Sequence, residues 1–187
     1  MDNDTGLHPL QNQWTLWFHS MPNNGTSWES NLQQVGTFDT VEMFWRYYRN
    51  AILPSCLDFK SNYLLFKHGI QPMWEDPQNA NGGKWIVFMK NDRAQLDSYW
   101  ENLILGLIGE TVDSDGDEIC GAVISRRRGA DRIAVWNKCS DDKEKIMCLG
   151  WAIKQAIISS SETPAQFTME WSVHTETTKA KGLRLVI

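Results

Sequence analysis

A short basic hairpin carries the first residues whose types and spacing could do chemistry. The turn at residues 128–131 leaves Arg127 and Arg132 directly opposite each other, and opposite residues of an antiparallel hairpin share one face. Trp136 lies four residues beyond Arg132, so it joins that face. Guanidinium groups suit bidentate contact with phosphate, and indole rings suit stacking. The pattern predicts that Arg127, Arg132 and Trp136 line one surface, which would suit a ligand with both a ring and an anion; a plain solvated basic hairpin is the alternative.

The arginines that flank this face are predicted to play no part in it. Arg126 and Arg128 alternate with Arg127 along the chain, so we expect both to point the other way, toward solvent.

Other groups of reactive side chains fall short of a site. The acidic run at 113–118 resembles the start of a calcium loop, but Ile124 stands where the twelfth position needs a glutamate. We therefore predict a solvated acidic loop. His174 and Glu176 have no third metal ligand near them in the sequence, which predicts a surface strand. The sequence contains no GxGxxG, Walker, HExxH or GxSxG motif, so we expect no enzyme, no cofactor and no metal.

The four cysteines form no CxxC pair and are predicted to be reduced thiols. The acidic, polar N-terminal run is unlike a signal peptide, and no apolar run is long enough to span a membrane. We expect a cytoplasmic protein, with the nucleus also open.

Length and charge narrow the class of protein. The chain has 187 residues, 42% of them apolar, with a formal net charge of −5. A chain of this length predicts a single domain, at residues 8–187. We expect residues 1–7 to be a disordered lead-in. The negative charge argues against a generic DNA or RNA binder. Ten tryptophans against four tyrosines and seven phenylalanines is the unusual count.

Periodicity and turn residues predict an α+β fold, an antiparallel sheet with three helices on one face. Strands are predicted at residues 14–18, 63–67, 84–89, 122–127, 132–137, 167–174 and 183–187. Helices are predicted at residues 39–50, at 95–109 and after residue 141. Asp39 and Glu42 have the spacing of a capping box, and Ser140 or Asp141 is the predicted cap of the third helix.

Several blocks of the sequence resemble the eukaryotic translation initiation factor 4E family, which binds the messenger-RNA cap. The resemblance runs in order from about His8 to the C-terminus. The blocks are HPLQNQWTLWF, TVEMFW, FKHGIQPMWED, GGKW, LIGE, ICGAV and DRIAVWNK. It implies a curved antiparallel sheet of about eight strands backed by three long helices. It also implies a cap slot on the concave face and protein partners on the convex face.

The resemblance implies roles for the residues of the slot. Trp28 and Trp74 sandwich the 7-methylguanine base, whose positive charge suits two π faces. The Glu75 carboxylate accepts two hydrogens from the guanine edge, and Trp136 lies near the N7 methyl group. Arg127 and Arg132 contact the cap phosphates. Weaker candidates for phosphate contact are Lys84, which stands where the family commonly has arginine, and Lys179 or Lys181.

A second surface is implied for protein partners, namely helical peptides of a factor 4G-type scaffold and of 4E-binding repressors. Its residues are His8, Pro9, Val41, Trp45, Glu101, Asn102, Leu105 and Glu110. Glu101 and Asn102 depart from the common family pattern, and the string WENLIL resembles the repressive cap-binding branch. Trp14 and Trp28 favour the initiation branch.

Three functions follow as hypotheses. The first is a cap-binding subunit that delivers messenger RNA to the initiation machinery. The second is a cap-binding repressor that does not recruit the scaffold. The third is a cap hydrolase, for which Glu75 and Asp76 alone make no metal site. We expect a protein that is monomeric on its own, with no DNA or membrane partner. The remaining tryptophans are predicted to lie mainly in the core and sheet: Trp14, Trp17, Trp85, Trp100, Trp151 and Trp171.

Overall fold

The computed structural model describes residues 6–20, 27–90, 93–113, 117–159, 167–174 and 185–187. An eight-stranded antiparallel sheet runs in the order β2-β1-β3-β5-β6-β4-β7-β8. The strands are β1 (Pro9–Ser20), β2 (Leu32–Thr40), β3 (Ser61–Lys67), β4 (Gly83–Met89), β5 (Ile119–Ser125), β6 (Asp131–Asn137), β7 (Met169–Val173) and β8 (Leu185–Val186).

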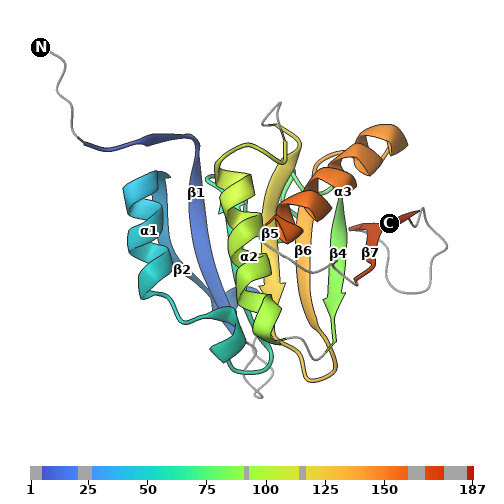
Figure 1. The fold of residues 1–187 in the computed structure, drawn as a ribbon. Helices are drawn as coiled ribbons and strands as arrows, with labels where there is room; N and C mark the ends of the chain where they lie inside the picture. Colours follow the sequence, from blue (N-terminus) through green and yellow to red (C-terminus); the bar gives the residue numbers. More distant parts are fainter. Residues whose placement is uncertain (1–5, 21–26, 91–92, 114–116, 160–166, 175–184) are drawn as a thin grey trace, which may run out of the picture.

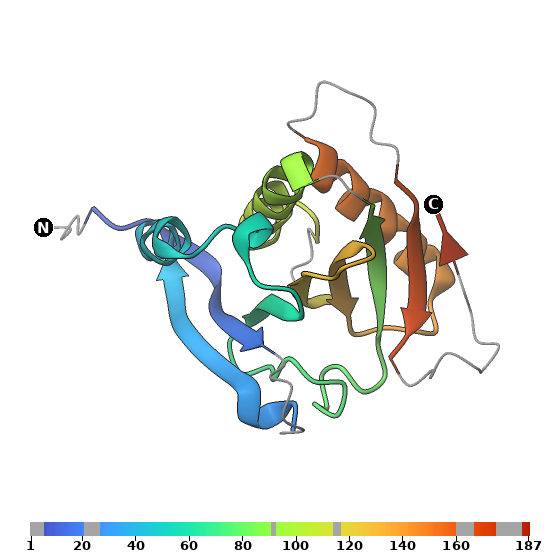
Figure 2. The ribbon, with the colours of Figure 1, turned by 90° about the horizontal axis from the view of Figure 1, so that it is seen from below.

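Three helices cover one face of this sheet (Figure 1). They are α1 (Val41–Asn50), α2 (Arg93–Ile108) and α3 (Lys143–Ile158), with short 3-10 turns at Glu29–Asn31 and Pro54–Cys56. Seen from below, the strands curve so that the helices lie on the convex side (Figure 2). The predicted fold class is confirmed. No helix in the described ranges is long and apolar enough to cross a membrane.

The main core lies between the helices and the convex face of the sheet. Leu96, Trp100 and Leu103 of α2 are fully buried there. Trp85 of β4 donates from its indole Nε1 to the carbonyl oxygen of Ile146 at 3.1 Å, which ties α3 to the sheet. A Cβ at Gly150 would lie 2.5 Å from the Trp85 ring, so the glycine allows this close approach.

The caps of two helices differ from prediction by one or two residues. The Thr40 hydroxyl, not the Asp39 carboxylate, accepts the backbone N–H of Met43 at 3.3 Å. Glu42 does not complete a capping box; its carboxylate instead binds His8, through the backbone N–H at 2.9 Å and the ring Nδ1 at 2.6 Å. Asp142 caps α3, in place of the predicted Ser140 or Asp141. Helix α1 begins at Val41, so Thr40 is the residue that precedes it and Asp39 is one position too early.

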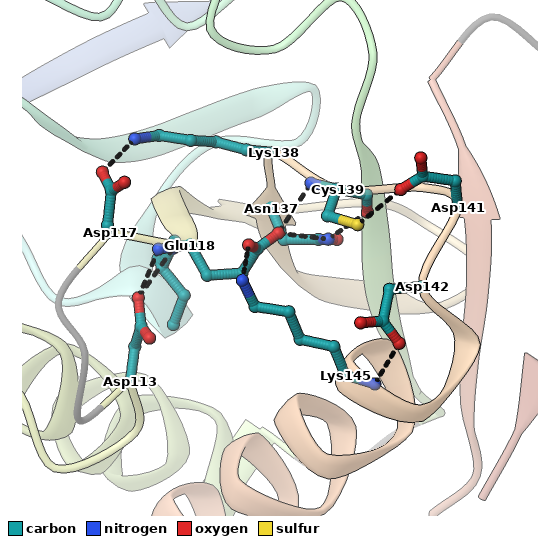
Figure 3. Close-up of polar contacts among 10 residues, drawn as sticks. Asp113, Asp117, Glu118, Asn137, Lys138, Cys139, Asp141, Asp142 and Lys145 are labelled. Carbon is teal, nitrogen blue, oxygen red and sulfur yellow. Dashed lines mark hydrogen bonds and ion pairs between the residues drawn. The ribbon is translucent and has the colours of Figure 1, made fainter.

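The predicted solvated acidic loop proves to be partly structural (Figure 3). Glu118 is only 7% exposed. It accepts the backbone N–H of Cys139 at 2.6 Å and the Asn137 amide at 3.3 Å, and pairs with Lys145 at 2.8 Å. Burial raises the pKa of Glu118, but these bonds outweigh it and the pKa is lowered overall. Asp113 caps the start of β5 by accepting the N–H groups of Glu118 and Ile119.

Strand β2 was not predicted. Phe38 is its only buried residue, and its polar positions give no clear alternation. Trp151, predicted to lie in the core, is 49% exposed on α3. The α3 residues that face the sheet recur at 146, 149, 153 and 157, which places position 151 on the solvent side. The Lys154 ammonium lies 5.2 Å from the centroid of the Trp151 ring.

Candidate functional site

A slot of about 570 Å³ opens on the face of the sheet opposite the helices. The pleat of four central strands builds its floor. Leu64, Val123, Ala134 and Ile86 line the slot, while their chain neighbours Leu65, Ile124, Val135 and Trp85 are buried in the main core. Successive side chains of a strand point to opposite faces, so each strand serves the core on one side and the slot on the other.

Two tryptophans stand on loops at the rim of this slot. Trp28 precedes the 3-10 turn Glu29–Asn31 and is half-buried, with one face against the ring of His19 at 4.8 Å and an interplanar angle of 24°. Trp74 is 53% exposed and lies on the loop between β3 and β4. Both line the slot, as the sandwich hypothesis requires.

The loop that carries Trp74 is held by its own polar side chains. The Asp76 carboxylate accepts the backbone N–H groups of Gln71 and Gln78, each at 2.8 Å. The fully buried Asn79 donates from its amide to the carbonyl oxygens of Gln71 at 2.9 Å and Met73 at 2.8 Å. These two roles were not predicted, although Asp and Asn in a proline-bounded loop are the residues that brace turns in this way.

Glu75 follows Trp74 and lines the same slot with an exposed side chain. A carboxylate is an acceptor with two oxygens, so it can meet two N–H groups at the edge of a flat ring. Because Glu75 lies beside the exposed Trp74 indole, its carboxylate can accept hydrogen bonds from the edge of a ring that stacks on that indole.

Trp136 of β6 also lines the slot. Its ring meets Phe66 edge-on at 5.4 Å and lies 4.1 Å from the ring of His174. His174 was predicted on a surface strand; the structure places it half-buried in the slot. Burial, with a smaller contribution from the charge of Lys84, lowers the pKa of His174 to about 3. The Lys84 ammonium lies 5.8 Å from the Trp136 ring centroid.

Three cations line the slot together: Arg127, Arg132 and Lys84. The predicted register of the hairpin is wrong, since Arg132 lies opposite Ser125 and Arg127 follows the end of β5. The shared surface is nevertheless real. Burial, and then the neighbouring charge of Arg132, lowers the pKa of both Lys84 and Arg127. The charged forms of these two side chains are disfavoured by burial and by the nearby positive charge. An anion that binds in the slot would therefore stabilise them.

Arg126 does not point to solvent as predicted. It is only 2% exposed and forms an ion pair with Asp131. Asp131 also accepts the backbone N–H of Arg127 at 2.8 Å, so this pair fixes the hairpin turn beneath the slot. Arg128 is exposed, as predicted. Lys179 and Lys181 lie outside the described residues.

The predicted partner residues meet on the convex side, where β1 joins α1 and α2. The carbonyl oxygen of His8 accepts the backbone N–H of Val41 at 2.9 Å, and Pro9 pairs with Thr40. The Asn12 amide donates to Glu110 at 2.7 Å, which brings the end of α2 to the same strand.

Four more predicted partner residues are half-buried on these helices: Trp45, Glu101, Asn102 and Leu105. The Arg49 guanidinium lies 5.0 Å from the Trp45 ring centroid. Asn102 donates from its amide to the carbonyl oxygen of Ile157 at 3.0 Å, so that side chain also links α2 to α3.

The slot can stack a flat ring, accept hydrogen bonds at its edge and neutralise an anion attached to it. Within the described ranges, no group of three or more His, Cys, Asp or Glu side chains is placed to hold a metal ion.

The fold and the residues that line this slot agree with one known protein family. The family model "Eukaryotic initiation factor 4E" matches residues 9–184. The chain belongs to the eukaryotic initiation factor 4E family.

Individual relatives agree with this assignment. The chain is 42% identical over 178 residues to eukaryotic translation initiation factor 4E-2 of Schizosaccharomyces pombe, covering 95% of this chain and 71% of that protein. It is 37% identical over 177 residues to translation initiation factor 4E of Homo sapiens, covering 94% of this chain and 79% of that protein.

Solved structures give the same result. The complex of Ascaris suum eIF4E-3 with an m2,2,7G cap superposes with a TM-score of 0.87 at 38% identity, covering 97% of this chain and 98% of that one. The complex of C. elegans eIF4E-3 with the 4E-binding protein Mextli and a cap analog superposes with a TM-score of 0.85 at 36% identity, covering 96% and 99%.

Proposed function

We propose that this protein binds the 7-methylguanosine cap at the 5′ end of messenger RNA in the slot. One observation carries the proposal. A single cavity is lined by two rim tryptophans, a carboxylate beside one of them, and three cations. Methylation at N7 gives the guanine ring a positive charge, and each tryptophan face attracts it by about 0.5–2 kcal/mol.

The other groups read the rest of the cap. Glu75 accepts hydrogens from guanine N1 and N2, a charge-assisted contact worth about 1.5–3 kcal/mol. Adenine lacks this pair of donors. Arg127, Arg132 and Lys84 neutralise the phosphates. A cluster this local is compatible with a net charge of −5, since the ligand is one modified nucleotide and not a long backbone.

Calorimetric titration with 7-methyl-GTP and with GTP tests the proposal. We expect 7-methyl-GTP to bind at least tenfold more tightly, because only its ring carries the charge that the tryptophans attract. Equal affinities would overturn the cap-binding function. Turnover of 7-methyl-GTP in the presence of magnesium would contradict a binding role without catalysis.

On the convex side we propose a docking surface for a helical peptide of a factor 4G-type scaffold, through which the protein recruits messenger RNA for translation. Val41 and Trp45 lie one helical turn apart on α1, and Leu105 on α2 is also half-buried rather than fully packed. Solved C. elegans eIF4E-3 in complex with Mextli supports a partner-binding role for this family.

A repressor that holds the cap without recruiting the scaffold is the second candidate. Glu101 and Asn102 are its support. Asn102, however, also bonds α3, so its identity has a role inside the molecule. A binding assay with a scaffold-derived helix separates the two candidates. Micromolar or tighter binding supports recruitment, whereas loss of that binding with full cap affinity supports the repressor.

A further inference from the structure

A buried histidine lies directly behind Trp28. His19 of β1 is 1% exposed and borders the slot, and its ring stacks on one face of Trp28 with 4.8 Å between the ring centroids and 24° between the planes. Because His19 covers that face, a cap base would have to use the other face of Trp28. The position of His19 therefore sets where that indole stands.

The same histidine is joined to the cationic end of the slot. Asn62 of β3 lies opposite His19 in the sheet and is 6% exposed. Its amide Nδ2 lies 2.9 Å from the His19 Nδ1. Its amide Oδ1 accepts a hydrogen bond from the Arg127 Nη2 at 2.9 Å. One short chain of contacts thus links Trp28, His19, Asn62 and Arg127.

The chemistry of the amide fixes the state of the histidine. A guanidinium can only donate, so Arg127 must face the Asn62 oxygen. That leaves the Asn62 N–H to donate to His19, whose Nδ1 must then be an acceptor. The imidazole is therefore uncharged, with its proton on Nε2.

The Arg127 guanidinium keeps capacity for a ligand. Its Nη1 also donates to the carbonyl oxygens of Arg126 at 2.8 Å and Ser61 at 3.4 Å. With the bond to Asn62, three of its five N–H donors are used within the described residues. Arg127 also lines the slot, so its remaining donors are available to an anion bound there.

We propose that His19 is a positioning residue that, as an uncharged acceptor, holds Trp28 and Arg127 in register through Asn62. The proposal rests on the cap-binding function above. Its consequence is that the base subsite and the phosphate subsite are coupled, so the slot favours a ring and its phosphates together over the ring alone.

Protonation of His19 would break this arrangement. A hydrogen on Nδ1 would face the Asn62 N–H, and rotating the amide would turn its N–H toward Arg127. The charge would also lie behind the indole that holds a cationic base. Among the described residues, Arg127 is the charged group that acts on this ring and Glu29 lines the same slot, while β2 places the apolar Leu32 opposite His19. Burial, and then the charge of Arg127, lowers the pKa of His19.

Calorimetry with 7-methylguanosine and 7-methyl-GTP tests the coupling. His19→Phe keeps an aromatic ring behind Trp28 and removes the acceptor. We expect its affinity for 7-methyl-GTP to fall about fivefold, with the nucleoside affinity within twofold of wild type. Asn62→Ala should behave alike, and the double variant should lose no more than either single one. His19→Gln keeps an acceptor but removes the aromatic ring that stacks on Trp28. Among these variants it should therefore show the largest loss of affinity for the nucleoside.

The pH profile supplies a second readout. As the solution is acidified, wild-type affinity for 7-methyl-GTP should fall more steeply than that of His19→Phe, because the ligand's own titration is common to both proteins. His68→Phe, a change at an exposed histidine, is the matched control and should keep the wild-type profile. Thermal melting confirms that each variant folds.

The results distinguish two failures. If wild type binds GTP and 7-methyl-GTP equally, the cap-binding function is wrong. If wild type prefers 7-methyl-GTP but His19→Phe has the same affinity and pH profile, the role of His19 alone is wrong. Equal losses for nucleoside and triphosphate in His19→Phe also contradict the coupling.

Discussion

The imidazole of His174 lies 4.1 Å from the indole of Trp136, with 44° between the two ring planes. Burial, and then the nearby charge of Lys84, lowers the pKa of this imidazole to about 3. The wall around Trp136 therefore carries no histidine charge at neutral pH. The positive charge on this side of the slot comes from Lys84 and Arg132, where phosphate is expected.

Removal of the exposed rim tryptophan should separate binding from stability. Trp74→Ala is expected to lower the affinity for 7-methyl-GTP by at least tenfold, because one π face of the sandwich is lost. The free energy of unfolding should change by less than about 0.5 kcal/mol, since the ring is largely exposed. Trp151→Ala is the matched control, because Trp151 is 49% exposed against 53% for Trp74. A similar loss of affinity in both variants would contradict the sandwich.

The choice of base is expected to depend on Glu75. Glu75→Gln replaces one acceptor oxygen with an amide that donates toward guanine N–H groups. We expect the preference for 7-methyl-GTP over 7-methyl-ATP to fall by about tenfold or more, consistent with the loss of a charge-assisted pair. Competition binding with both nucleotides measures this ratio. Glu29→Gln changes another carboxylate that lines the slot and should leave the ratio as it is; a matching fall there would sink the assignment to Glu75.

The buried ion pair under the hairpin should matter for folding. Arg126→Ala leaves the Asp131 carboxylate buried without its cation. Such a change typically destabilises by about 3–5 kcal/mol. Arg128→Ala, two positions away and exposed, should cost less than about 0.5 kcal/mol. Urea denaturation of both variants gives the comparison, and equal midpoints would show that the pair contributes nothing.

The junction between β1 and α1 should weaken in acid. The hydrogen bonds from the His8 side chain and backbone lower the pKa of Glu42 from 4.5 to about 2. A carboxylate with a depressed folded-state pKa contributes stability that is present above its unfolded value and lost as pH falls through its folded value. The contribution of Glu42 should therefore disappear between about pH 5 and pH 2.

Melting temperatures across that range provide the measurement. Wild type should lose more of its melting temperature than Glu42→Gln between pH 5 and pH 2, and the two should converge at the acid end. Parallel curves would rule out the bond between His8 and Glu42 as a source of stability.

Local patterns in the sequence were enough to predict the bounds of the elements with strong periodicity. Helix α2 was predicted to within two residues at its start and one at its end, because its apolar positions recur at helical spacing. The shared face of Arg127, Arg132 and Trp136 was predicted correctly from the hairpin, although its register was not. The register depends on where β5 ends, and Arg127 lies beyond that end.

The missed features depend on the register of the hairpin or on contacts between segments distant in the sequence. Arg126 looked like one more surface arginine, and only the folded hairpin shows that Asp131 neutralises it. His19 gave no signal in its own strand, because its partners come from β3 and from the loop before Glu29. His174 lies in the slot because β7 pairs with β4 beside Lys84. Spacing along the chain does not encode any of these neighbours.

Alternate side chains of β4 belong to the core and to the slot, so substitutions at the two sets of positions have different effects. Trp85 and Val87 belong to the main core, whereas Lys84 and Ile86 line the slot. Exchange of Lys84 for another cation, or a change in the size of Ile86, would alter the ligand preference of the slot with little change in how the chain folds. Ligand preference and foldability can therefore drift independently on the same strand, and changes at slot-facing positions should mark functional divergence between paralogues.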